Sequence, residues 1–130
     1  MKTLEIQTPS REALVDITSL VEEEVRREKI NTGLCLVYAP HTTAAITINE
    51  NADPTVRQDV LMTLKKAVPD TLSYAHSEGN SPAHVKASLV GSSVLLIIED
   101  GRLALGTWQG IFFCEFDGPR RRKVYLKIIS

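Results

Sequence analysis

Alternating apolar and polar positions mark the beginning of the chain as extended structure. Residues 2–8 (KTLEIQT) repeat with a period of two, as an edge strand does, and residues 13–19 (ALVDITS) fit a second short strand. The spacing then becomes helical, because the apolar residues between positions 20 and 25 fall on one stripe. Ser19 and Glu22 have the spacing of a capping box. The pattern therefore predicts two strands followed by a surface helix.

Two apolar runs then surround the first histidine. Residues 33–39 (GLCLVYA) and 44–50 (AAITINE) both have the composition of strands, and Pro-His-Thr-Thr separates them. Proline cannot donate to a central ladder, so Pro40 interrupts the extended structure. His41 is therefore expected at a strand end or a bend.

Two polar residues followed by proline predict the starts of two further helices. Asp53 can accept hydrogen bonds from the free N–H groups of a first turn, and the helical pattern after it stops before Pro69. Ser81 begins a second, shorter helix in the same way, over residues 82–91. This start places His84 in the first turn of that helix.

The last third of the chain reads almost entirely as strand. From about Ser92, apolar runs are separated by an Asp-Gly turn at 100–101 and an Asp-Gly-Pro turn at 117–119. No helix of more than two turns is expected inside 103–128. Helices in the first two-thirds and a strand-rich end favour one α+β domain over residues 1–130, with two to three helices and a mixed, largely antiparallel sheet or sandwich.

Composition narrows the classes of partner. At 130 residues and 43% hydrophobic content, the chain supports one compact core, and its net charge of -1 gives no general attraction to nucleic acid or anionic lipid. No apolar run approaches the roughly 20 residues that cross a bilayer, and the first residues lack a secretory signal. Cys35 and Cys114 lie in strand-like runs without CxxC spacing, which favours buried free thiols. We therefore expect a cytoplasmic protein that binds neither nucleic acid nor membrane.

The three histidines stand at predicted ends of elements and are the first candidates for chemistry. Neutral imidazole is the commonest protein ligand of zinc, and a catalytic zinc site takes three protein ligands. The helix dipole disfavours a charged His84, which keeps its ring able to bind a metal. The alternative is that His41 caps a turn while His76 and His84 are ordinary surface residues. Their eight-residue spacing is not a recognised metal signature, so spacing alone leaves both interpretations open.

Acidic and amide residues flank these histidines. Glu50, Asn51 and Asp53 stand at the end of the strand that follows His41, and Asn80 lies between the other two histidines. If strand pairing brings His41 toward Asn80, these side chains could orient the imidazoles or act as general bases. Asp53 has an alternative role as a helix N-cap, which requires no catalysis.

Five further residues are candidates for substrate contact: Thr42, Thr43, Trp108, Gln109 and Arg120. Trp108 follows a glycine inside a predicted strand and offers an apolar face to a ligand, but it could equally anchor the core or a subunit interface. Arg120 begins an Arg-Arg-Arg-Lys run, and guanidinium groups match phosphate oxygens, although most such runs are simply solvated. P-loop, dinucleotide-binding and serine-hydrolase motifs are absent from the sequence.

Three blocks of the sequence resemble, in order, the YjbQ-like family, whose members are often described as secondary thiamine-phosphate synthases. The blocks are APHTTAAITINE at 39–50, YAHSEGNSPAHVKASLVGSS at 74–93 and GRLALGTWQGIFFCEFDGPRRRKV at 101–124. The resemblance implies an α+β, sandwich-like subunit that assembles as a homotrimer with pockets close to the subunit boundaries. It also implies that His41, His76 and His84 gather around a divalent metal, zinc in the first place and magnesium as the alternative.

The same resemblance implies a reaction. Secondary thiamine-phosphate synthase joins hydroxymethylpyrimidine diphosphate to a thiazole phosphate and releases thiamine phosphate and pyrophosphate. A dedicated magnesium enzyme would use carboxylates rather than three imidazoles, whereas a histidine-rich site suits metal-activated water. A metal-dependent hydrolase of a small phosphorylated substrate is therefore the first alternative, and a non-enzymatic trimer that binds metal or ligand is the second.

Overall fold

The computed structural model describes residues 1–130 as two antiparallel sheets and three helices. The strands are β1 (Lys2–Gln7), β2 (Ala13–Asp16), β3 (Gly33–Tyr38), β4 (Ala44–Glu50), β5 (Ser93–Glu99), β6 (Arg102–Leu103), β7 (Gln109–Glu115) and β8 (Arg121–Ile129). The helices are α1 (Thr18–Glu28), α2 (Pro54–Ala67) and α3 (Ser81–Val90). The α+β prediction is confirmed, including the strand-rich last third.

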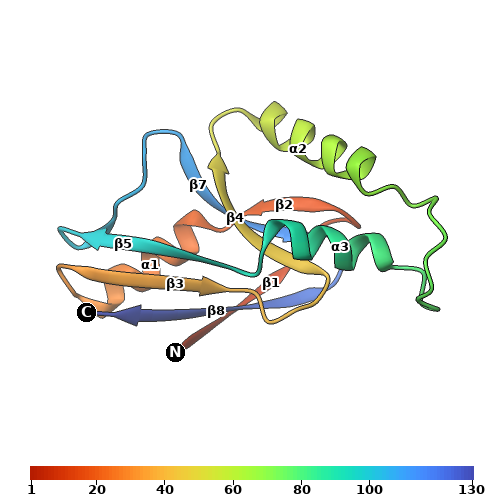
Figure 1. Cartoon of the computed structure of the whole chain (residues 1–130). Helices are drawn as coiled ribbons and strands as arrows, with labels where there is room; N and C mark the ends of the chain where they lie inside the picture. Colours follow the sequence, from red (N-terminus) through yellow and green to blue (C-terminus); the bar gives the residue numbers. More distant parts are fainter.

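The two sheets and a pair of helices form successive layers (Figure 1). One sheet has the order β1-β8-β3-β5-β6 and the other has the order β2-β7-β4, and every strand pair is antiparallel. Apolar residues of both sheets and of α1 form the larger core cluster, in which Phe113 and Val37 are fully buried. On the other side of the three-stranded sheet, Phe112 and Cys114 belong to a second cluster that α3 covers with Ala83. The other face of the five-stranded sheet has no covering layer within the chain.

The first helix begins two residues earlier than a cap at Ser19 predicts, and the capping box is wrong. The residue before α1 is Ile17, whose side chain makes no capping bond. Asp16 Oδ1 instead accepts the backbone N–H of Thr18 at 3.0 Å and its hydroxyl at 2.6 Å. This carboxylate satisfies a free N–H group at the start of the helix, whereas a capping box at Ser19 would have bound the N–H of Glu22.

The predicted start of α2 is confirmed, and α3 begins one residue earlier than predicted, after Asn80 rather than after Ser81. Asp53 caps α2, because its Oδ1 accepts the backbone N–H of Thr55 at 2.9 Å. The helix α3 begins at Ser81 with proline next, and the Asn80 carbonyl accepts the N–H of Ala83 at 3.0 Å. No helix in the structure is long and apolar enough to cross a membrane.

One local prediction in the last third is wrong. Gly106 and Trp108 lie in a turn before β7 and not inside a strand. Gln109 closes this turn, because its Oε1 accepts the N–H of Gly106 at 2.8 Å while its own N–H donates to the Gly106 carbonyl at 3.1 Å. The side chain of Gln109 therefore serves the backbone.

Candidate functional site

Two of the three histidines face one shallow depression. His41 lies in the link between β3 and β4, and His84 is the fourth residue of α3. Both line an open hollow of about 370 Å³ together with Thr42, Ser88 and Ser92. We call this depression the histidine hollow. Hydroxyl and imidazole groups dominate its polar lining, which suits a small polar ligand.

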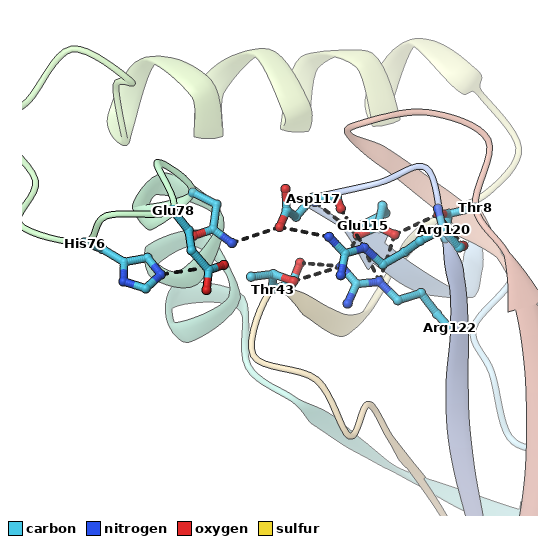
Figure 2. Close-up of polar contacts among 9 residues, drawn as sticks. Thr8, Thr43, His76, Glu78, Glu115, Asp117, Arg120 and Arg122 are labelled. Atoms are coloured by element: carbon cyan, nitrogen blue, oxygen red, sulfur yellow. Dashed lines mark hydrogen bonds and ion pairs between the residues drawn. The ribbon is translucent and has the colours of Figure 1, made fainter.

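The loop between α2 and α3 brings the third histidine to the second. The rings of His76 and His84 meet edge to face, with centroids 5.4 Å apart. Glu78 lies beside them, with its Oε2 3.9 Å from His76 Nε2 (Figure 2). The structure therefore pairs these two imidazoles at the edge of the hollow.

The three histidines of one chain do not assemble a metal site. No group of three or more His, Cys, Asp or Glu side chains is placed so that it could hold a metal ion. His41 Nε2 already accepts the backbone N–H of Lys123 at 3.0 Å. The residues of a single chain therefore do not fit a three-imidazole zinc centre, and metal binding stays a prediction from resemblance.

A buried ion pair lies behind the hollow at the ends of β7 and β8. Glu115 and Arg122 are 0% and 3% exposed, and Arg122 Nε donates to Glu115 Oε1 at 2.9 Å while Nη2 donates to Oε2 (Figure 2). Thr8 donates its hydroxyl to Glu115 Oε1 at 2.7 Å, and Arg122 Nη2 also donates to Thr43 Oγ1 at 2.9 Å. Thr43 is thus buried in this network rather than placed in the hollow.

A second polar group joins the start of α3 to the turn between β7 and β8. Asn80 Nδ2 donates to Asp117 Oδ2 at 2.9 Å, and Arg120 Nη2 donates to the same oxygen at 3.2 Å (Figure 2). Arg120 Nε also donates to the Asp117 carbonyl at 2.9 Å, which fixes the direction of its side chain. Asn80 Oδ1 is buried and accepts no hydrogen bond. Two of the predicted site residues, Asn80 and Arg120, therefore meet on Asp117.

Burial and neighbouring charges keep the His41 ring neutral. Burial lowers the pKa of His41, and the positive charges of Arg122 and Arg120 lower it further; these effects outweigh the hydrogen bond with the Lys123 backbone and the charge of Glu115, which act in the opposite direction. An N–H group can donate only to an unprotonated nitrogen, so the Nε2 that accepts the Lys123 amide carries no proton. At neutral pH this ring is a hydrogen-bonding group and not a cation.

The remaining predicted residues lie at the opposite end of the three-stranded sheet. Glu50 ends β4 and pairs with Gln109, whereas His41 precedes the start of β4. The strand separates the two ends by about 20 Å, at roughly 3.4 Å per residue. Trp108 is 63% exposed at this far end, and Asp53 caps α2 there. Within one chain, the expected approach of these residues to His41 does not occur.

The largest hollow of the molecule is also at that far end. It has a volume of about 1020 Å³ and is lined mainly by polar side chains, among them Asp16, Asn51, Arg102 and Gln109. It contains no histidine. Volume alone does not identify a reactive site. We regard the smaller histidine hollow as the candidate site because it brings together two of the three histidines, the side chains best suited to proton transfer near neutral pH.

Comparison with known proteins identifies the family. The profile described as "UPF0047 protein YjbQ-like" matches residues 2–130. The chain belongs to the YjbQ-like (UPF0047) family. It is 54% identical to UPF0047 protein MJ1081 of Methanocaldococcus jannaschii, over 97% of this chain and 91% of that protein. It is 52% identical to UPF0047 protein YugU of Bacillus subtilis, over 100% of this chain and 99% of that protein.

Solved structures of the YjbQ-like family have the same fold. The crystal structure of a YjbQ/UPF0047 family protein from Clostridium acetobutylicum matches with a TM-score of 0.97 and 53% identity, over 99% of this chain and 100% of that one. A YbjQ-like protein from Sulfolobus solfataricus matches with a TM-score of 0.94 and 35% identity, over 98% and 94% of the two chains.

Sequence reasoning missed the acidic half of the polar network in this YjbQ-like chain. Glu115 and Asp117 were not among the predicted site residues, although each holds an arginine. A signal was present, because Glu115 is a lone carboxylate inside the apolar run GIFFCEF. A charge within a buried strand needs a partner, and Arg122 alternates onto the buried side of β8 while Arg121 stays exposed.

Proposed function

We propose that this YjbQ-like protein is an enzyme that acts on a small phosphorylated substrate held in the histidine hollow. The observation that carries the proposal is the meeting of His41 and His84 in one hollow, with Arg120 close enough for its charge to affect the pKa of His41. Imidazoles, a guanidinium and hydroxyl groups suit the recognition and transfer of phosphate oxygens.

The reaction that we propose is thiamine-phosphate synthesis. The thiazole nitrogen forms a bond to the methylene carbon of hydroxymethylpyrimidine diphosphate, while the carbon–oxygen bond to the diphosphate breaks and pyrophosphate leaves. The charge that develops on the leaving oxygens requires hydrogen-bond donors and cations. Arg120, which is half exposed and oriented by Asp117, supplies a cation. The ring N–H groups of His41 and His84 donate hydrogen bonds to the leaving oxygens.

One observation favours hydrolysis of a phosphate ester as a second candidate. His76 and His84 are in contact, and the carboxylate of Glu78 lies near His76 at an edge that is open to solvent. An imidazole next to a carboxylate can act as a general base toward water. This activity would require only one substrate, which makes it separable from the synthase.

The divalent metal implied by the resemblance is part of the proposal but carries none of its steps. His76 and His84 are the two imidazoles that one chain brings together, and zinc or magnesium would supply a Lewis acid. We also propose a cytoplasmic location, which the two buried free thiols of Cys35 and Cys114 support.

The deciding experiment incubates tag-free protein, with and without added zinc or magnesium, with the two thiamine precursors separately and together. Thiamine phosphate and pyrophosphate formed only when both precursors are present would support the synthase. Orthophosphate released from one precursor alone would replace it with the hydrolase. Saturable binding without any turnover would contradict both enzymatic proposals and favour a ligand-binding trimer.

We further propose that the chain assembles as a homotrimer, which the uncovered face of the five-stranded sheet supports. This face exposes Leu34, Leu95 and Ile97, and Ile97 pairs with Leu34 in the β3–β5 register. Such an apolar surface is typical of a protein interface.

Light scattering should therefore give about three times the subunit mass of 14.4 kDa. Ile97→Asp should lower this mass, because it places a charge in the apolar face. Leu72→Asp is the matched control, since Leu72 is equally exposed but lies in the loop after α2. A wild-type protein of one subunit mass at micromolar concentration would contradict the proposal.

A further inference from the structure

His41, in the link between β3 and β4, supplies a hydrogen-bond acceptor to β8 where the strand β3 no longer does so. The β3–β8 pairing ends with Tyr38 opposite Tyr125, and the same register continued by two residues would place Pro40 opposite Lys123. The strand β3 stops before that point, so the N–H of Lys123 receives no backbone partner from it. His41 Nε2 accepts this N–H at 3.0 Å, which satisfies the donor.

This hydrogen bond determines the tautomer of the ring. A neutral imidazole has one nitrogen with a lone pair and one with a proton. Since Nε2 uses its lone pair to accept from Lys123, the proton of His41 resides on Nδ1. Nδ1 makes no hydrogen bond to any protein group, and His41 lines the histidine hollow. Its N–H is thus available to a ligand.

The same bond is incompatible with metal binding at either nitrogen. A metal on Nε2 would need the lone pair that the Lys123 N–H now occupies, and would leave that N–H without a partner. A metal on Nδ1 would move the proton to Nε2, where it would face the Lys123 N–H across 3.0 Å. Two donors opposed at this distance repel each other, so ligation requires that the contact be broken.

We infer that the Lys123 peptide holds His41 as the Nδ1–H tautomer, so that His41 donates a hydrogen bond to an anionic phosphate oxygen and does not ligate a metal. The substrate class in this inference rests on the proposed function, whereas the tautomer rests on the hydrogen bond alone. A neutral donor fits the leaving pyrophosphate, because it stabilises negative charge without giving up its proton. His41 is then a binding residue, and proton transfer falls to another group.

Nitrogen NMR of protein labelled in its histidines tests the inference without any turnover. Two-bond correlations to the ring protons distinguish a protonated from an unprotonated nitrogen, and His76→Asn and His84→Asn variants assign the signals. We expect an unprotonated Nε2 and a protonated Nδ1 for His41 at neutral pH. Added zinc should leave both His41 nitrogens unchanged, and added inorganic pyrophosphate should shift Nδ1.

Three outcomes would overturn the inference: a protonated Nε2, a zinc-dependent shift of either His41 nitrogen together with the Lys123 amide, or no response of Nδ1 to saturating pyrophosphate. Lys123→Pro is the supporting variant, because it removes the N–H that His41 accepts. Proline also fixes φ at position 123 and restricts the backbone of Arg122, so circular dichroism must first show that the variant is folded. In a folded Lys123→Pro protein, the fixed tautomer should be lost. Absence of turnover with the thiamine precursors would contradict the proposed function and leave the tautomer result intact, so the two failures are distinguishable.

Discussion

Glu115→Gln is expected to lower the free energy of unfolding by about 3–5 kcal/mol, the range for breaking one partner of a buried ion pair. The substitution leaves the guanidinium of Arg122 charged and only 3% exposed, with its strongest acceptor removed. Arg122→Met should lower the free energy of unfolding by a similar amount, because it leaves the buried carboxylate of Glu115 without its cation. Urea denaturation followed by circular dichroism measures both changes.

Two controls separate this effect from a general loss of packing. The double variant Glu115→Leu with Arg122→Met removes both charges and should cost clearly less than the sum of the single changes. Glu23→Gln removes the exposed partner of Arg27 and should cost at most about 1 kcal/mol. Single variants at Glu115 and Arg122 that cost no more than the Glu23 variant would contradict the importance of the buried pair.

The ion pair also makes stability depend on pH in one direction. Burial by itself raises the pKa of Glu115, but hydrogen bonds from Arg122, Thr8 and the N–H of Asp117 outweigh it, so the net pKa is below its ordinary value. A folded-state pKa below the unfolded one stabilises the protein above the unfolded value. This stabilisation is lost as the pH falls from the ordinary glutamate range toward the lower folded value. The Glu115→Gln variant should lack this part of the acid dependence.

Local patterns predicted the order of elements well, because each signal acts over a few residues. The Asp53 cap and the helix start near Ser81 use groups that are neighbours in sequence. The cap was confirmed, and the helix start was correct to within one residue. The prediction of a strand around Gly106 was wrong for a related reason. Its residues have strand-like composition, but Gln109 bonds back to Gly106 and closes a turn that the apolar pattern conceals.

The candidate site was only partly accessible from the sequence, because its geometry depends on long-range pairing. The sequence marked His41 and His84 as residues at element ends, and the structure brings them to one hollow. The sequence could not show that β4 places Glu50 at the end of the sheet far from His41, because that direction follows from the β4–β7 register. The sequence also could not predict that the backbone N–H of Lys123 donates to His41, because this bond depends on where β3 ends beside β8.

His84→Ala is expected to lower kcat/KM for the precursor reaction by roughly 10²–10⁴-fold, the usual contribution of a positioned acid or base. The change removes the imidazole that lies in the hollow and contacts His76, while alanine preserves the helix. Val85→Ala is the matched control, because Val85 is the next residue of α3, is exposed and does not line the hollow. An activity of His84→Ala within about threefold of the control would exclude a chemical role for His84.

The central claim is that the substrate binds in the histidine hollow and not in the larger hollow, or groove, of about 1020 Å³ at the far end of the three-stranded sheet. Backbone amide NMR of the labelled protein, titrated with hydroxymethylpyrimidine diphosphate, tests this claim most directly. We predict saturable shifts at Thr42, His84 and Ser88, which line the hollow. Saturable shifts confined to the groove residues Asn51, Arg102 and Gln109, with none in the hollow, would contradict it.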